Sequence, residues 1–94
     1  MMLTGRKTGG MLPGMMTPAQ CRAARALLDW SQADLAARSG VGCSTIRSFE
    51  HGRHTLIRSN MAMLRATLET AGVVFIEAEE IGPGVLLRTG RATG

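Results

Sequence analysis

The side chains in this sequence that are best suited to bind a partner are arginines, and several of them lie close together in one short stretch. Arg47, Arg53 and Arg58 occur there together with His51 and His54. Arginine forms paired hydrogen bonds with phosphate groups and with guanine edges. The whole chain has 11 Lys and Arg against 7 Asp and Glu, and its pI is near 10.5. This balance favours a nucleic acid as the partner, although acidic proteins and membrane surfaces attract the same charge.

Other kinds of chemistry find little support among the remaining reactive residues. Cys21 and Cys43 form no C-x-x-C pair, so neither a zinc ribbon nor a disulfide scaffold is indicated. His51 and His54 lack two further ligands nearby, so no metal site is expected. The sequence has no Gly-rich phosphate loop, no nucleophile elbow and no paired carboxylates on a common face. We therefore expect neither an enzyme nor a bound cofactor.

Length and composition limit the architecture that can position these residues. The chain has 94 residues, of which 45% are hydrophobic and 3% aromatic. That length suits one small domain and excludes barrels and doubly wound enzymes. The scarcity of aromatic residues favours closely packed small helices over an aromatic-rich sandwich. Since no run of 18 apolar residues and no signal-peptide core occur, we expect a soluble, cytoplasmic protein with no membrane partner.

Four helices are predicted from their start and stop signals. Thr17 and Pro18 supply a capping hydroxyl and a proline at the first helical position. Ser31 and Asp34 have the spacing of a capping box for the second helix. Glycines follow the third and fourth helices, where a left-handed residue often ends a helix. The helices are expected over residues 18–29, 32–38 and 43–51, and from Ser59 or Asn60 to 71.

The period changes from helical to extended after Gly72. Runs rich in β-branched and aliphatic residues at 73–76 and 85–87 flank the sequence Gly82-Pro83-Gly84, which predicts a β-hairpin turning at those three residues. A lone hairpin is marginal in water, so it must pack on the fourth helix or find a partner strand. The fold class is therefore mainly α, with four helices and a C-terminal hairpin. The expected divisions are a disordered arm over 1–16, a helical domain over 17–72, the hairpin over 73–88 and a disordered tail over 89–94.

Two stretches of the helical region resemble a known DNA-binding family. Residues 28–41 and 44–52 are similar to the helix-turn-helix of Cro and the phage repressors, also called the xenobiotic-response-element family. The matching positions are Ser31-Gln32, Leu35-Ala36, Gly40-Val41, Ile46 and Glu50-x-Gly52. The resemblance covers about residues 21–72. It implies a lambda-repressor-like domain whose third helix enters the major groove of double-stranded DNA.

The resemblance also assigns roles to individual residues. It implies base contacts from the exposed side of the third helix, by Cys43, Ser44, Arg47 and Ser48. Arg47 is the only long donor among these four and can make a bidentate contact with guanine. Phosphate contacts are implied for Gln32, Thr45, His51, Arg53, His54 and Arg58. Arg25 and Glu50 fall where family members often form a partly buried ion pair, which we expect to be structural.

The hairpin departs from the five-helix pattern common in this family, because a short extended tail replaces the last helix. Residues 1–72 carry nine Lys and Arg against four Asp and Glu, a net +5, whereas residues 73–94 carry two against three, a net −1. We expect the hairpin to mediate a homodimer, with apolar contacts from Phe75 and Ile76 or from Val74. A dimer would place two recognition helices about 34 Å apart on an inverted repeat.

The leading functional hypothesis is a sequence-specific transcriptional regulator of bacterial type, most simply a repressor. One alternative is the antitoxin or accessory subunit of a toxin-antitoxin module, in which the hairpin binds a protein partner. Another is a protein-interaction module that keeps the helical fold without binding DNA. Loss of DNA binding after charge reversal at Arg47 and Arg53 would separate the first two hypotheses from the third.

Overall fold

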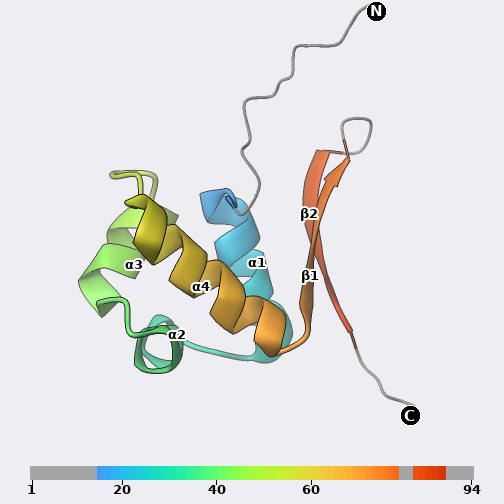
Figure 1. Cartoon of the computed structure of the whole chain (residues 1–94), viewed down its shortest axis with the longest axis horizontal. Coiled ribbons are helices and arrows are strands. Elements are labelled where there is room, and N and C mark those ends of the chain that lie inside the picture. The colour runs from blue at the N-terminus through green and yellow to red at the C-terminus, as the bar shows by residue number, and fades with distance from the viewer. Residues whose placement is uncertain (1–14, 79–81, 89–94) are drawn as a thin grey trace, which may run out of the picture.

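The computed structural model describes residues 15–78 and 82–88 and has four helices followed by a two-stranded antiparallel sheet (Figure 1). The elements are α1 Pro18–Leu28, α2 Gln32–Ser39, α3 Cys43–Glu50, α4 Arg58–Thr70, β1 Val73–Ala78 and β2 Gly82–Leu87. This arrangement confirms the predicted mainly α fold with a C-terminal hairpin. Most of the expected N-terminal arm, residues 1–14, and the expected tail, 89–94, lie outside the described residues.

Side-chain caps fix the starts of the first two helices, as their sequences predict. In α1 the backbone N–H of Gln20 donates to the Thr17 hydroxyl over 3.0 Å, and the Gln20 side chain accepts from the Thr17 N–H over 2.9 Å. Ser31 and Asp34 repeat this reciprocal pattern at α2, with both distances 2.9 Å. Because these bonds satisfy backbone donors that a helix leaves free at its start, both helices begin at defined residues.

The fourth helix begins earlier than predicted. It starts at Arg58, and its N-cap residue, Ile57, makes no side-chain capping bond. Ser59 and Asn60, the expected openers, instead lie inside the first turn. The helix is held by its buried face of Met61, Leu64 and Leu68 rather than by a cap. The C-terminal ends of all four helices differ from the prediction by single residues. At the end of α1, Asp29 takes a left-handed φ of 59° and so stands just outside the helix.

The hydrophobic core draws side chains from every helix and from the hairpin. Its buried members are Met16, Cys21, Ala24, Leu35, Val41, Ile46, Phe49, Met61, Leu64, Leu68 and Val73. Met16 is only 2% exposed, which contradicts its assignment to a disordered arm. It stands just before the N-cap Thr17, a position where an apolar residue commonly packs against the first turns of a helix. The ordered core therefore begins before the first cap.

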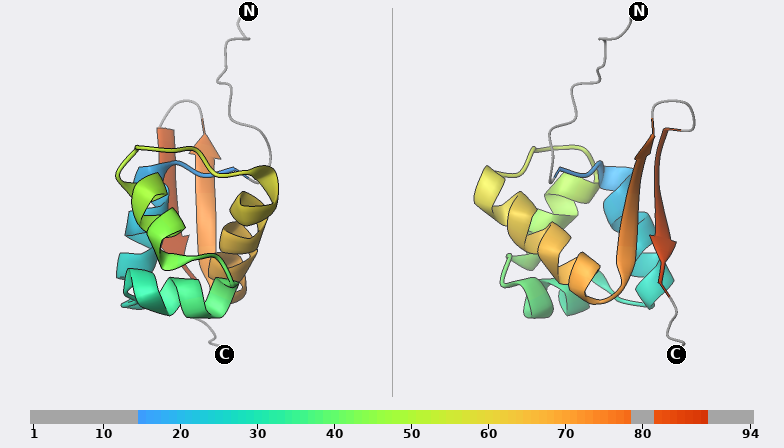
Figure 2. Two further views of the ribbon diagram at one scale, coloured as in Figure 1. Left: turned by 90° about the vertical axis from the view of Figure 1, so that its left-hand side faces the viewer. Right: turned by 45° about the vertical axis from the view of Figure 1, so that its right-hand side comes forward.

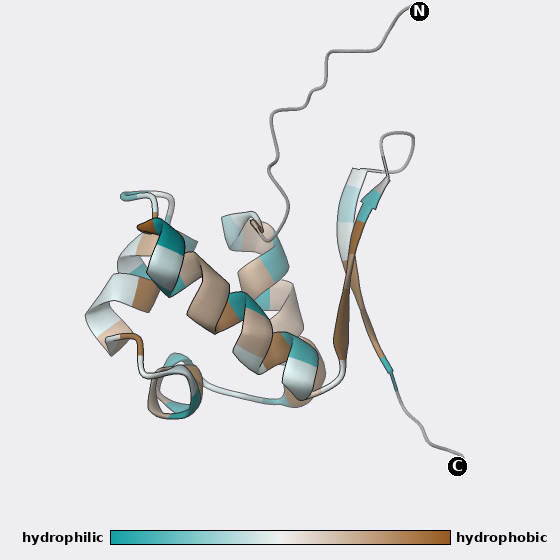
Figure 3. Cartoon of the chain, viewed as in Figure 1, coloured by the Kyte–Doolittle hydropathy of each residue, from teal (hydrophilic) through white to brown (hydrophobic). Residues whose placement is uncertain are grey.

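The hairpin packs along one side of the helices, with β2 beside α1 and β1 beside α4 (Figures 1 and 2). Its register pairs Val73 with Leu87 and Phe75 with Val85, and these four side chains pack on the helical core. Figure 3 shows the hydrophobic residues gathered in the half of each strand nearest the end of α4. The hairpin thus completes the core, and α4 is one of its two supports, as the sequence led us to expect.

The predicted turn at Gly82-Pro83-Gly84 is wrong, because all three residues belong to β2. In the observed register Ile76 faces Gly84 and Glu77 faces Pro83. Each strand of a two-stranded sheet is an edge strand, where a proline is tolerated because one of its sides makes no ladder bonds. The connection between the strands runs through 79–81, which lie outside the described residues.

Candidate nucleic-acid interface

A short turn sets the angle between α2 and α3. Gly40 ends α2 with a φ of 82°, a left-handed conformation that favours glycine. The next residue, Val41, is buried between the helices, and its N–H donates to the Ser39 hydroxyl over 3.1 Å. These contacts join the two helices into a helix-turn-helix. Figure 2 shows α2 and α3 on the side of the molecule away from the hairpin.

The third helix has one buried face and one polar face. Ile46, Phe49 and Glu50 are buried, whereas Ser44 and Arg47 are exposed. Cys43, Thr45 and Ser48 are half-buried along the borders between the two faces. The four residues expected to contact bases thus lie on consecutive turns of α3, and none of them belongs to the hydrophobic core. The polar face offers one long cationic donor among small side chains.

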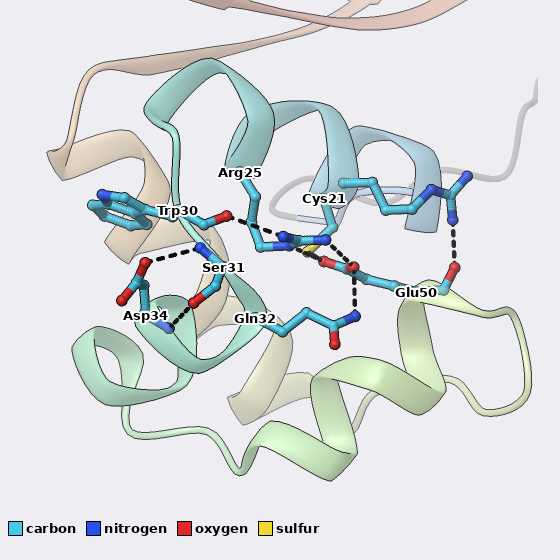
Figure 4. A network of polar contacts seen from close by, with 8 residues as sticks. Cys21, Arg25, Trp30, Ser31, Gln32, Asp34 and Glu50 are labelled. Carbon is cyan, nitrogen blue, oxygen red and sulfur yellow. Dashed lines mark hydrogen bonds and ion pairs between the residues drawn. The ribbon is translucent and has the colours of Figure 1, made fainter.

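The Glu50 carboxylate, at the C-terminal end of α3, joins three helices (Figure 4). Its side chain is 0% exposed and forms an ion pair with Arg25 of α1, whose Nη2 lies 2.7 Å from Oε1. The Arg25 Nε donates to Oε2 over 2.8 Å. Gln32 Nε2 of α2 donates to Oε1 over 3.0 Å, and the Cys21 thiol donates to Oε2 over 3.1 Å. All four bonds meet on one carboxylate that fixes α3 against α1 and α2.

Electrostatics keep this carboxylate charged. Burial alone would raise the pKa of Glu50, but hydrogen bonds from Arg25, Gln32 and Cys21 outweigh it and lower the pKa below its usual value. The hydrogen bond between Arg25 and Glu50 also raises the pKa of Arg25. Burial, followed by the neighbouring carboxylate of Glu50, raises the pKa of the Cys21 thiol far above its usual value. Cys21 is therefore a neutral hydrogen-bond donor, whereas Arg25 and Glu50 form a true ion pair.

The expected phosphate-contacting residues occupy three places on the surface. Gln32 is half-buried at the first position of α2, with its amide nitrogen directed at Glu50. Thr45 lies in the first half of α3. The remaining four follow α3 along the chain and are all exposed: His51, Arg53, His54 and Arg58. The start of this basic segment is tied to α3, because the Arg53 N–H donates to the Ser48 carbonyl over 2.9 Å.

The sequence prediction missed the contacts made by two polar residues of α1, Arg22 and Gln20. Arg22 of α1 donates from Nη1 to the backbone carbonyl of Glu50, at the end of α3. Gln20 is 2% exposed, and its Nε2 donates to the carbonyls of Ile76 and Gly84 over 3.2 and 3.1 Å. The position of Arg22 three residues before Arg25 was a usable signal, since such spacing places side chains on neighbouring parts of a helix face.

Two other kinds of site are not found among the residues that the structure describes. Over 15–78 and 82–88, no three His, Cys, Asp or Glu side chains are grouped so that they could hold a metal ion. Within the same ranges, no helix has both the length and the hydropathy needed to cross a membrane.

Comparison with known families identifies the helical unit. The helix-turn-helix family matches residues 22–63, which begin in α1 and end in α4, so that α2, the turn and α3 are covered completely. No curated protein matches the chain. The matched segment contains the turn between α2 and α3, the buried Glu50 carboxylate and the polar face of α3 described above. Residues 22–63 thus form a DNA-binding helix-turn-helix domain of the Cro and phage-repressor type, a family of transcriptional regulators.

Proposed function

We propose that the protein is a sequence-specific regulator that inserts α3 into the major groove of DNA. The observation that carries this proposal is the division of α3 into a buried face and a polar face. A helix can enter the major groove only if one of its faces is free for the bases while the other holds it to the domain. Ile46 and Phe49 supply the holding face, and Arg47 projects from the free one.

Base reading in this proposal depends mainly on Arg47. A bidentate contact between its guanidinium and a guanine contributes about 1–3 kcal/mol of discrimination. Ser44 and Ser48 have short side chains whose hydroxyls can hydrogen-bond to more than one kind of base. Cys43 is small enough to pack against a thymine methyl group. With one long donor and three small side chains, α3 reads few bases strongly. Sequence-dependent DNA shape then supplies part of the specificity.

Phosphate contacts in this proposal come from both ends of the helix-turn-helix. Gln32 lies at the start of α2, where free backbone N–H groups and the helix dipole favour an anion. Its bond to Glu50 holds the side chain in place and leaves a second amide N–H for a phosphate oxygen. Thr45, His51, Arg53, His54 and Arg58 extend the contacts along the DNA backbone. Such contacts set the position of α3 but carry no sequence information themselves.

A homodimer is the second part of the proposal. Val74, Ile76 and Leu86 lie on the hairpin face that does not pack on the core, and Leu86 is 58% exposed. Phe75 faces the helices instead, where the Arg65 guanidinium stacks 4.5 Å from its ring, so it is not part of this face. We propose that the outer face pairs with the same face of a second copy about a two-fold axis. Binding to an operator next to a promoter would then repress transcription by excluding the polymerase.

Selection of bound sequences from a random pool of DNA duplexes tests the proposal. The protein should enrich one motif at moderate salt, and a dimer should enrich two inverted half-sites separated by one helical turn. Enrichment of a single half-site would contradict the dimer alone. Non-specific attraction to phosphate weakens as the salt concentration rises, so both low and moderate salt are used. Equal recovery of all sequences at both concentrations would contradict sequence-specific binding.

A further inference from the structure

Arg22 connects the first helix to the end of the third. Its Nη1 donates to the backbone carbonyl of Glu50, the last residue of α3. Carbonyls in the last turn of a helix have no partner within that helix, and the helix dipole makes this end attractive to a cation. Arg22 therefore supplies a cap for α3 from another part of the chain.

Most of the Arg22 guanidinium remains available after this bond. The group has five N–H donors, and one of them reaches Glu50. The Glu50 carboxylate itself is occupied by Arg25, Gln32 and Cys21. Among the residues that the structure describes, no carboxylate forms an ion pair with Arg22, which is exposed. Arg65 shows the contrast, since it forms ion pairs with the two carboxylates of Glu69 and Glu77.

The position of Arg22 relates it to the proposed phosphate contacts. The carbonyl that it caps belongs to Glu50, and the chain continues from there into His51 and Arg53, both exposed. The charge of Arg22 thus adds to the basic segment at the end of α3, although it comes from a different helix. A DNA strand that follows the end of α3 would meet positive charge from both.

We propose that Arg22 is a further DNA-backbone contact, which holds the end of α3 with one N–H and a phosphate oxygen with others. This inference rests on the proposed DNA-binding function and adds a residue outside the α2–α3 unit. It gives Arg22 two linked roles: it positions the recognition helix and it links that position to the phosphate. The neutralised phosphate releases counterions, which makes the contact visible in the salt dependence of binding.

Salt-dependent binding of the full chain to the duplex recovered by selection tests this inference. Arg22→Gln should weaken binding about tenfold at low salt, as expected for loss of a charge-assisted hydrogen bond. The plot of the logarithm of the binding constant against the logarithm of the salt concentration should become shallower by about 0.9, because one phosphate contact is lost. Arg22→Lys keeps the charge and should restore most of the slope. Arg88→Gln, which removes an exposed charge at the end of the hairpin, should leave the slope unchanged.

The outcomes distinguish this inference from the function on which it rests. If Arg22→Gln lowers the melting temperature and the affinity but keeps the wild-type slope, Arg22 acts on structure alone and the inference is wrong. Unchanged affinity and slope would also overturn it. If the wild-type chain binds no duplex even at low salt, both the inference and the proposed function are contradicted. If the wild type binds the duplex and the salt dependence of Arg22→Gln is shallower than that of the wild type, both the inference and the proposed function are supported.

Discussion

Arg25 and Glu50 meet through two parallel hydrogen bonds, from Nε to Oε2 at 2.8 Å and from Nη2 to Oε1 at 2.7 Å. The arginine side chain is 18% exposed and the glutamate side chain 0%. Removing one partner of a buried ion pair leaves a charge without compensation, at a cost of about 3–5 kcal/mol. Glu50→Ala should therefore lower the free energy of unfolding by that amount, measured by denaturant titration.

The exposed ion pair between Arg65 and Glu69 provides a control for this prediction. Glu69 is 48% exposed, and surface pairs of this kind contribute about 0–1 kcal/mol. Glu69→Ala should thus change stability far less than Glu50→Ala. Equal effects of the two substitutions would contradict the structural role assigned to Glu50.

The lowered pKa of Glu50 predicts a specific dependence of stability on pH. A carboxyl whose pKa is lower in the folded protein stabilises the fold above its unfolded pKa, about 4.3, and this stability is lost as the pH falls through the folded value. Wild-type stability should therefore decline below about pH 5. Glu50→Gln should be less stable at pH 7 and should show a smaller decline.

Denaturant titrations at several pH values between 7 and 3 measure this difference. The pKa of Asp34 is also lowered, mainly by its hydrogen bond from the Ser31 backbone. It titrates in both proteins, so its contribution cancels in the comparison. Parallel curves for the wild type and Glu50→Gln would show that Glu50 is not the group responsible.

Gln20 is predicted to hold the hairpin to the first helix. Its amide donates to the carbonyls of Ile76 in β1 and Gly84 in β2. Gln20→Ala removes both bonds and the capping bond to Thr17, and should destabilise the protein by about 1–3 kcal/mol. Thr17→Ala is the matched control, because it disturbs the same cap but keeps both hairpin contacts.

Hydrogen exchange measured residue by residue distinguishes these two variants. Gln20→Ala should speed exchange in β1 and β2 more than Thr17→Ala does, after correction for global stability. The same increase in both variants would mean that Gln20 acts only as a cap.

The outer face of the hairpin is predicted to hold the dimer together. Leu86→Lys places a charge on that face and should raise the dissociation constant of the dimer by at least tenfold. Leu27→Lys changes a similarly exposed leucine, 41% against 58%, on α1 and should leave association unchanged. Analytical ultracentrifugation measures both. A monomeric wild type, or a Leu86→Lys variant that associates normally, would contradict the dimer.

Patterns along the chain predicted local features well and long-range contacts poorly, and the Arg25–Glu50 pair, 25 positions apart, was expected only from the family resemblance. Thr17, Ser31 and Gly40 mark helix ends through interactions within a few residues, so their roles were readable along the chain. The bonds from Cys21 and Gln32 to Glu50 span 29 and 18 positions and depend on how three helices pack. No local pattern encodes such a meeting point.

The hairpin shows the same division between local and long-range information. Its existence followed from two β-branched and aliphatic runs, but the turn was misplaced because Gly82-Pro83-Gly84 carries the strongest local turn signal. The observed register instead places Phe75 opposite Val85 and both against the helices, where burial stabilises the pairing. Met16 was misassigned for a similar reason, since only the folded core shows that it is buried.

Recognition of DNA by α3 is the central claim, and the binding of Arg47→Ala tests it most directly. Fluorescence anisotropy would compare the wild type and the variant on the selected duplex and on a duplex with its guanine changed. Arg47→Ala should bind the selected duplex about 1–3 kcal/mol more weakly, with little further loss when the guanine is changed. Because Arg47 is exposed, the melting temperature of the Arg47→Ala variant should match that of the wild type. Wild-type affinity and wild-type discrimination in the variant would contradict the assignment of α3 as the recognition helix.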